Sequence, residues 1–479
     1  MPLSRFISSY LNFKILILFF FCPIVLAAQS DSLSESIIVI EKINIEGNKK
    51  TKVGTILREL EFAVGDSLPT RGLPAVLERN RLRLMNLGIF SEASISVAEW
   101  GSEGRVVLRI RISEGWYVFP VPILSLSDRN FNVWWNEFNR SFNRVNYGLD
   151  WSQLNLTGRA DALKAKAQFG FTNRYELAYR SPGLNRNRTL GLEASLSYSR
   201  AHELSYKTTA NKLEFLKVRE TWQLEQILAS VTLISRPKLF QSQSFTLEYR
   251  DNQIDDTVAQ VLNPDYFLKG ATRQRHFSAV YSLSFDYRDI RPYPLKGWRA
   301  FIEIRKNGLL PSDDLQLFRA FAEWNQYFSF NKWLSLELVG KVRASLPRRQ
   351  PPQSNNQALG YGGNLVRGYD YYVVDGLDFG LLRTSWHFRV LEDVFYLGRF
   401  MPIKAYRKMP IKIYFALNND LGWANDPYYT ATNPLSNRVL YGFGPGLDFV
   451  LYYDKSIRCE WTWNHLGEGG FFLRINTGL

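Results

Sequence analysis

The chain has 479 residues, a formal net charge of +14 and an aromatic content of 15%. Although 46% of the residues are hydrophobic, the mean hydropathy is only −0.21, so apolar side chains are interleaved with polar ones. This composition excludes a disordered chain, and the interleaving is typical of strands with one polar and one apolar face.

The amino-terminal segment contains the only long apolar run of the chain, residues 15–28. At about 14 residues the run is shorter than the ~20 that a membrane-spanning helix needs, and Ala27 and Ala28 offer a cleavage site. We therefore predict a secretory signal peptide over residues 1–28. Its removal would leave Cys459 as the sole cysteine, which excludes an internal disulfide in the mature chain.

The predicted export and the charge of the chain favour a membrane protein over a nucleic-acid-binding protein. No second run of ~20 apolar residues follows, so an exported chain this rich in aromatics is left with a closed β-barrel as its means of spanning a membrane. The 59 Lys and Arg outnumber the 45 Asp and Glu, but they are scattered rather than clustered in one arm or helix. Anionic lipid headgroups or a polar lumen explain this charge better than nucleic acid does.

Residues 37–116 differ in pattern from everything downstream. The predicted elements are, in chain order, a strand over residues 37–45, a helix that Thr51 can cap, a helix over about residues 73–85, and strands over residues 93–97 and 106–112. In the second helix, Arg79, Arg81 and Arg83 should lie largely on the solvent side. The predicted order is β-α-α-β-β, which describes a small α+β domain.

A proline-punctuated linker is predicted over residues 117–142, and the rest of the chain, residues 143–479, reads as strand after strand. About sixteen segments have near the ~9 to 11 residues that a tilted membrane strand requires, and aromatic residues gather near their ends as interfacial girdles would. We therefore predict a transmembrane antiparallel β-barrel of sixteen strands. The alternative is a soluble β-sandwich, which would be unusually large and unusually rich in tyrosine.

One glycine-rich stretch among these strands, residues 359–369, has the sequence LGYGGNLVRGY. Gly362 and Gly363 would let a loop turn inward, and Gly368 would let the backbone pass closely against another element. The tetrapeptide Val366-Arg367-Gly368-Tyr369 resembles the motif at the tip of the inward-folded loop in BamA- and TamA-like outer-membrane proteins. That superfamily inserts or translocates proteins across bacterial outer membranes.

The resemblance implies that Arg367 lies in the barrel lumen, where a guanidinium away from water needs carboxylate or carbonyl partners. Asp420 is the best candidate, because Asp420 and Gly422 resemble the family's Asp-x-Gly element on a late barrel strand. A bidentate pair of Arg367 and Asp420 would lock the loop to the inner wall, with the ring of Tyr369 packed beside it. The alternative is a surface loop with an exposed arginine.

Three short segments, residues 43–48, 87–90 and 112–114, resemble the strand ends and turns of a single POTRA domain, the periplasmic module of the same superfamily. Such a module would offer a short sheet edge to an incoming extended chain. An isolated α+β domain with another purpose is the alternative. A second family-like element, residues 287–298, resembles the superfamily's Arg-Asp to Pro-x-Gly hairpin, and we interpret it as architecture.

The carboxyl-terminal strand supplies the predicted seam residues, which are Phe471, Phe472, Leu473, Arg474 and Ile475. We expect this strand to close the barrel against the first barrel strand, near residues 143–151. In the family this seam is thought to open laterally and to pair with client strands. Many members end in Phe or Trp, whereas this chain ends in Gly478-Leu479.

The residue patterns do not indicate an enzyme. The four histidines are far apart in the sequence and lack metal-ligand spacing. Neither a Gly-x-Ser-x-Gly elbow nor a phosphate-binding loop is present in the sequence. We therefore expect no catalytic residues, no cofactor and no metal.

The predicted protein is an assembly or translocation factor of the bacterial outer membrane, with its POTRA domain in the periplasm. Its expected partners are unfolded outer-membrane or secreted client proteins, outer-membrane lipid and possible accessory assembly subunits. Nucleic acid is not an expected partner. A passive outer-membrane channel stays open as an alternative, although it needs no POTRA domain. A two-partner-secretion transporter is another, and it should carry a plug helix and two POTRA domains. A secreted enzyme would need a catalytic constellation that the sequence lacks.

Overall fold

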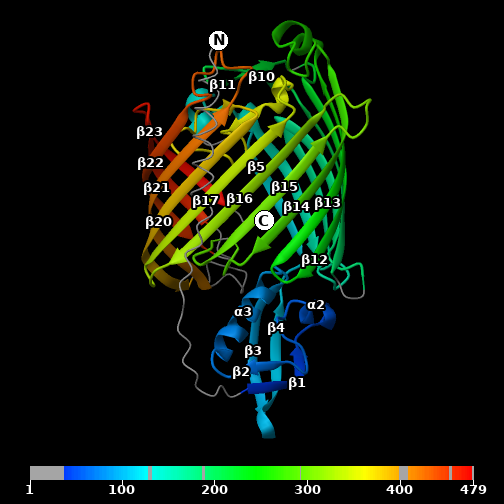
Figure 1. Ribbon diagram of the computed structural model, residues 1–479, viewed down its shortest axis with the longest axis vertical. Helices are drawn as coiled ribbons and strands as arrows, with labels where there is room; N and C mark the ends of the chain where they lie inside the picture. The colour runs from blue at the N-terminus through cyan, green and yellow to red at the C-terminus, as the bar shows by residue number, and fades with distance from the viewer. Residues whose placement is uncertain are drawn as a thin grey trace, which may run out of the picture.

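The computed structural model describes residues 37–127, 132–185, 189–218, 220–291, 293–396, 398, 408–451 and 456–476. The predicted signal peptide, residues 1–28, lies outside the described residues. Within them a small α+β domain sits below one end of a tall β-barrel, and loops cover the other end (Figure 1). No helix in the described ranges is long and apolar enough to cross a membrane.

The small domain packs two helices against a four-stranded sheet. Its elements are β1 (Ile37–Glu46), α2 (Val53–Leu57), β2 (Ser67–Pro69), α3 (Leu73–Met85), β3 (Phe90–Trp100) and β4 (Arg105–Glu114). The sheet order is β2-β1-β4-β3, and Leu108 and Ile110 of β4 share one core with Leu84 of α3. This confirms the predicted α+β domain. Arg83, however, is buried rather than solvent-facing, because its guanidinium lies 4.7 Å from the ring of Phe240 in the barrel.

The barrel consists, within the described residues, of sixteen antiparallel strands, which confirms the predicted fold class. They are β5 (Val118–Leu126), β6 (Val145–Leu154), β7 (Ala162–Gly170), β8 (Thr172–Ser181), β9 (Leu190–Ala201), β12 (Leu224–Lys238), β13 (Gln241–Ile254), β14 (Arg273–Asp286), β15 (Gly297–Asn307), β16 (Leu317–Ser329), β17 (Leu334–Leu346), β20 (Asp378–Tyr396), β21 (Lys408–Asn425), β22 (Val439–Val450), β23 (Ser456–Asn464) and β24 (Gly469–Asn476). Each strand pairs with the next one named here, so β5 and β24 are the two ends of the sheet.

The barrel begins earlier in the chain than predicted. Residues 117–142, predicted as a linker, contain β5, which pairs with β6 along its whole length. The predicted first strand, near residues 143–151, is β6 and therefore lies second in the sheet. Pro120 and Pro122 made this segment look like a linker in the sequence, because proline disfavours a strand in the interior of a sheet. Proline is found in sheets almost only on edge strands or at bulges, and β5 is an edge strand.

Side chains alternate between the outer wall and the lumen along the barrel strands. In β22, for example, Tyr441 is exposed on the outside and Asp448 is buried inside. At the end near the small domain, Trp298 stacks on Tyr287 and on Trp324, with ring centroids 4.7 and 4.8 Å apart. Stacked aromatic rings at the end of an apolar wall are the arrangement expected of an interfacial girdle.

Polar contacts hold the small domain against the turns of the barrel. Thr55 Oγ1 donates to the carbonyl oxygen of Gly158, in the β6–β7 turn, at 3.1 Å. The Glu59 carboxylate accepts hydrogen bonds from Arg236, near the end of β12, at 2.8 and 3.0 Å. Burial alone would raise the pKa of Glu59, but the guanidinium groups of Arg236 and Arg58 outweigh it and hold the pKa below its usual value. A buried charge pair therefore joins the two parts.

The loop between β17 and β20, residues 347–377, folds into the lumen. It contains the short antiparallel strands β18 (Gln357–Leu359) and β19 (Val374–Asp375). From the wall, Arg343 donates to the carbonyl oxygens of Gly376 and Leu377 at 2.8 and 3.2 Å. The hairpin of β10 (Glu203–Thr209) and β11 (Lys212–Lys217) lies at the barrel end away from the small domain (Figure 1). The lumen is therefore occupied by a loop that the wall holds in place.

Candidate functional site

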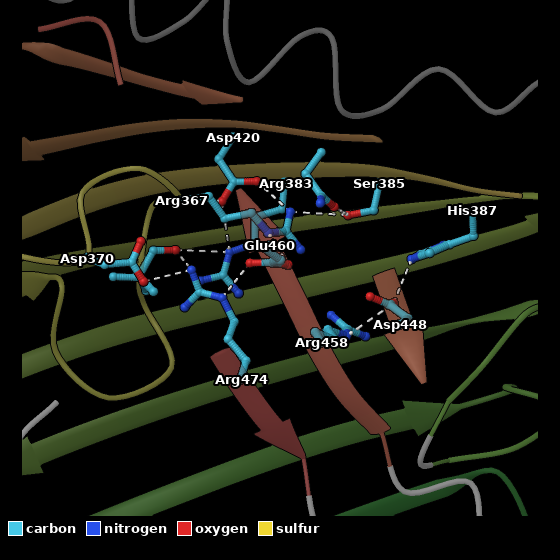
Figure 2. A network of polar contacts seen from close by, with 12 residues as sticks. Arg367, Asp370, Arg383, Ser385, His387, Asp420, Asp448, Arg458, Glu460 and Arg474 are labelled. Atoms are coloured by element: carbon cyan, nitrogen blue, oxygen red, sulfur yellow. Dashed lines mark hydrogen bonds and ion pairs between the residues drawn. The ribbon is translucent and has the colours of Figure 1, made fainter. Parts of the chain in front are cut away.

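Arg367 lies at the tip of the lumen loop and is only 6% exposed. Its Nη1 donates to Asp420 Oδ1 at 2.9 Å, and its backbone N–H donates to Asp420 Oδ2 at 2.9 Å. Its Nε donates to Glu460 Oε1 at 3.1 Å (Figure 2). The structure thus brings Arg367 and Asp420 together. The guanidinium, however, bridges the carboxylates of β21 and β23 instead of making the predicted bidentate contact with one of them.

Six charged side chains form the cluster around this contact, which we call the lock. Within the described residues they are Arg367, Arg383, Arg474, Asp370, Asp420 and Glu460. Asp420 and Glu460 are 0% and 1% exposed, and three positive charges balance three negative ones. Removal of one member would break at least one buried ion pair, and breaking such a pair costs about 3–5 kcal/mol. The lock therefore fixes the loop to β20, β21, β23 and β24.

The loop tip passes close to the wall on both sides of Arg367. Gly368 has a φ of +83°, in the left-handed region, and a Cβ there would lie 2.6 Å from the carbonyl oxygen of Trp463. Val366 is buried over Gly422, where a Cβ would lie 2.4 Å from Val366 Cγ2. Gly422 therefore provides space for the loop, while Asp420, two residues earlier on the same face of β21, provides the charge.

The remaining predicted loop residues flank this tip. Tyr369 is buried, its hydroxyl contacts Nδ1 of His465, and the two ring centroids lie 5.7 Å apart. Gly362 has a φ of +54°, and the carbonyl oxygen of Gly363 accepts a hydrogen bond from Lys341 Nζ at 3.2 Å. The structure thus places both glycines where the chain turns between β18 and the tip, with Gly363 against the wall.

The predicted seam residues lie on β24, with alternating directions. Phe472 is buried, and its ring lies 5.8 Å from that of Tyr371 in the lumen loop, whereas Phe471 is exposed on the outer wall. Arg474 points inward and belongs to the lock. Leu473 and Ile475 pair with Cys459 and Ile457 of β23. The seam strand is therefore tied to the lumen loop by an aromatic contact and by an ion pair.

Sequence reasoning missed three members of the lock, Glu460, Arg383 and Asp370. Glu460 alternates with the exposed Trp461 in β23, and that alternation could have indicated a lumen-facing carboxylate. Its partner could not have been predicted in this way, because Arg367 and Glu460 are brought together only by the position of the loop inside the barrel. Arg474 was a predicted seam residue, and its role as an ion-pair partner came only with the structure.

Two family models match the chain. The Omp85 superfamily domain matches residues 155–376, and the POTRA model, described as the surface antigen variable number repeat, matches residues 38–115. These matches support an Omp85 superfamily protein. No curated protein matches the chain.

Solved structures resemble this Omp85 protein at low sequence identity. BamA from Haemophilus ducreyi lacking POTRA domains 1–3 is 14% identical, covers 91% of this chain and 83% of its own, and has a TM-score of 0.52. CdiB from Acinetobacter baumannii is 14% identical, with 91% and 74% covered and a TM-score of 0.48. CdiB from Escherichia coli is 11% identical, with 99% and 98% covered and a TM-score of 0.48. At these identities, the match to BamA shows a shared fold.

Family and fold together locate the protein. The barrel lies in the outer membrane and the POTRA domain, residues 38–115, lies in the periplasm. The barrel end that faces the POTRA domain is therefore periplasmic, and the end covered by β10 and β11 is extracellular. Omp85 membership assigns the protein, in broad terms, to the insertion or translocation of proteins at the outer membrane.

Proposed function

We propose that this Omp85 protein receives unfolded outer-membrane or secreted clients through its POTRA domain and assists their insertion or passage at the barrel seam. The observation that carries the proposal is the chemistry of the edge strand β5. No cofactor or metal takes part in the proposed cycle. The work comes from client folding, because backbone groups that are unpaired in lipid are satisfied when strands pair.

The edge of β5 that faces the seam lacks two backbone N–H donors. Tyr117 accepts a hydrogen bond from Leu154 of β6, and Ser127 donates one to the carbonyl oxygen of Arg144, just before β6. The odd-numbered residues of this segment therefore direct their backbone groups toward β6. The even-numbered residues therefore direct theirs toward the seam. Pro120 and Pro122 are both even-numbered, and proline has no N–H to donate. Two potential ladder hydrogen bonds are thus missing from the periplasmic half of this edge.

The contact that the structure describes across the seam comes from a side chain. Among the described residues, no backbone pairing joins β5 to β24. The side-chain amide of Asn132, which follows β5, contacts the carbonyl oxygen of Phe471 in β24. A side chain can be displaced without dismantling a ladder, so an incoming client strand could take its place and pair with the edge of β24.

The POTRA domain offers an edge of its own. In the sheet order β2-β1-β4-β3, the eleven-residue strand β3 is paired on one side only within the described residues. The opposite edge, β2, has only three residues. A long free edge can bind an extended peptide by strand addition, with main-chain hydrogen bonds that tolerate many sequences. Such tolerance suits a protein that handles several unfolded clients.

The locked loop favours this proposal over the passive channel. A channel for small solutes needs an open lumen, whereas residues 347–377 occupy the lumen and are held there by the lock. Client passage at the seam does not need the lumen to empty. The loop contact with Phe472 of β24 would then serve to hold the seam strand in place.

The experiment is client folding in liposomes. The full-length protein is reconstituted in liposomes, an unfolded outer-membrane β-barrel is added, and folded client is scored by its heat-dependent mobility on a gel. We expect folding to be faster than in protein-free liposomes, and faster than in liposomes that contain an unrelated barrel. Conductance is recorded on the same preparation. Client folding that is not accelerated, together with steady passage of small solutes, would establish the passive channel instead.

A further inference from the structure

The turn between β14 and β15, of which residues 287–291 and 293–296 are described, reaches into the periplasmic mouth of the barrel. Its Tyr293 is only 5% exposed, and the hydroxyl donates to Asp448 Oδ2 of β22 at 2.8 Å. The ring stacks on Tyr414 of β21, with centroids 5.2 Å apart and planes at 30°. In the described sheet, β16, β17, β20 and β21 lie between β15 and β22. The turn therefore spans the mouth of the barrel, from β14 and β15 on one part of the wall to β22 on another.

The far end of this turn is held by a second buried charge cluster. Asp448 is 3.5 Å from Nε2 of His387 and 3.4 Å from Nε of Arg458 (Figure 2). The guanidinium of Arg458 also lies 5.7 Å from the centre of the Tyr293 ring. One carboxylate thus gathers contacts from the turn, β20 and β23. The lock also contacts both β20 and β23, and β23 is the neighbour of the seam strand β24.

The near end of the turn meets the docked POTRA domain. The guanidinium of Arg83, in α3, lies 4.7 Å from the centre of the Phe240 ring. Phe240 stacks on Tyr287, the first residue of the turn, with ring centroids 4.5 Å apart and planes at 21°. Beside this stack, Arg236 near the end of β12 forms the ion pair with Glu59. A continuous series of contacts therefore runs from the POTRA helix to the root of the turn.

We propose that Tyr293 is a positioning residue, which makes the β14–β15 turn a strut that links POTRA docking to the position of β22 and β23 beside the seam. The inference rests on the proposed function. A hydrogen bond to a buried carboxylate at one end and stacked rings at the other give the strut two fixed ends. When the POTRA domain moves away from the barrel, the root of the turn loses its support. Asp448 then loses its phenol donor, and the strands beside the seam loosen.

The first test removes one atom from the strut. Tyr293→Phe deletes the hydroxyl and keeps the ring, and Tyr287→Phe is the matched control, because Tyr287 belongs to the same turn and is 43% exposed. Hydrogen exchange is measured on the full-length protein in lipid nanodiscs, with heat-dependent gel mobility as the check of folding. We expect amides of β22 and β23 to exchange about tenfold faster in Tyr293→Phe, as for loss of one hydrogen bond to a charged acceptor, and unchanged in the control. Unchanged exchange in Tyr293→Phe would overturn the strut.

The second test asks whether POTRA docking and the strut are coupled. Glu59→Gln removes the charge that docks the POTRA domain and should also accelerate exchange in β22 and β23. In a Tyr293→Phe background the same substitution should add little, because the link is already broken. Equal effects of Glu59→Gln in both backgrounds would show that the two sites are independent, and this result would refute the proposed strut. Neither test uses a client, so a failure of client folding in liposomes would refute the proposed function separately.

Discussion

Replacement of Arg367 by methionine is expected to release the lumen loop from the wall. Asp420 and Glu460 would lose the cation that bridges them. They would keep other partners, because Arg383 Nε lies 3.6 Å from Asp420 and Arg474 Nε lies 2.6 Å from Glu460. We therefore take the lower end of the range for breaking a buried ion pair, about 3 kcal/mol. At about 1.4 kcal/mol for each factor of ten, the released loop becomes about a hundredfold more populated.

Hydrogen exchange of residues 347–377 measures this population in the full-length protein in nanodiscs. Arg299→Met is the matched control, since Arg299 pairs with Glu323 at 2.9 Å on the inner wall between β15 and β16. We expect loop amides to exchange about a hundredfold faster in Arg367→Met and at the wild-type rate in the control, with both barrels folded by gel mobility. Loop exchange within about twofold of wild type in a folded Arg367→Met barrel would refute the reasoning.

A double substitution separates the ion pair from other effects of the change. Asp420→Asn combined with Arg367→Met removes one charge of each sign from the lock. Its effect on loop exchange should be smaller than the sum of the two single effects, because neither partner is then left buried without the other. Additive effects would mean that Arg367 holds the loop through its size rather than through its charge.

Three further outcomes are expected. Pro120→Ala with Pro122→Ala adds two N–H donors at the seam; the barrel should gain about 1–2 kcal/mol in gel-monitored heat unfolding, and clients should fold more slowly in liposomes. Gly442→Ala would place a Cβ 1.7 Å from the carbonyl oxygen of Arg367, so loop exchange should accelerate, whereas Gly380→Ala, with no atom within 4 Å, should not alter it. Because the pKa of Glu59 is lowered, POTRA docking measured by crosslinking should persist above the ordinary glutamate pKa and weaken as pH falls through the lowered value.

The architecture could be predicted from the sequence because its causes are local. Strand length and the alternation of apolar and polar residues specify a membrane barrel from short segments, whatever those segments pair with. The helix over residues 73–85 followed from the spacing of its own apolar positions, and its observed bounds are Leu73–Met85. Likewise, the Val-Arg-Gly-Tyr tetrapeptide and Asp420 could be singled out, because a buried guanidinium requires an acceptor and a short motif marked the loop.

Tertiary structure alone decided which partners these residues have. Two proline residues made β5 read as linker, and only its pairing with β6 shows that it is the edge of the barrel. Arg83 has the spacing of a solvent-facing residue in α3, yet it is buried where the POTRA domain meets Phe240. Glu460 is 93 residues from Arg367 in the chain and 3.1 Å from it in space. Contacts of this kind depend on how the curved sheet places separate elements relative to one another, and no local pattern of residues encodes that placement.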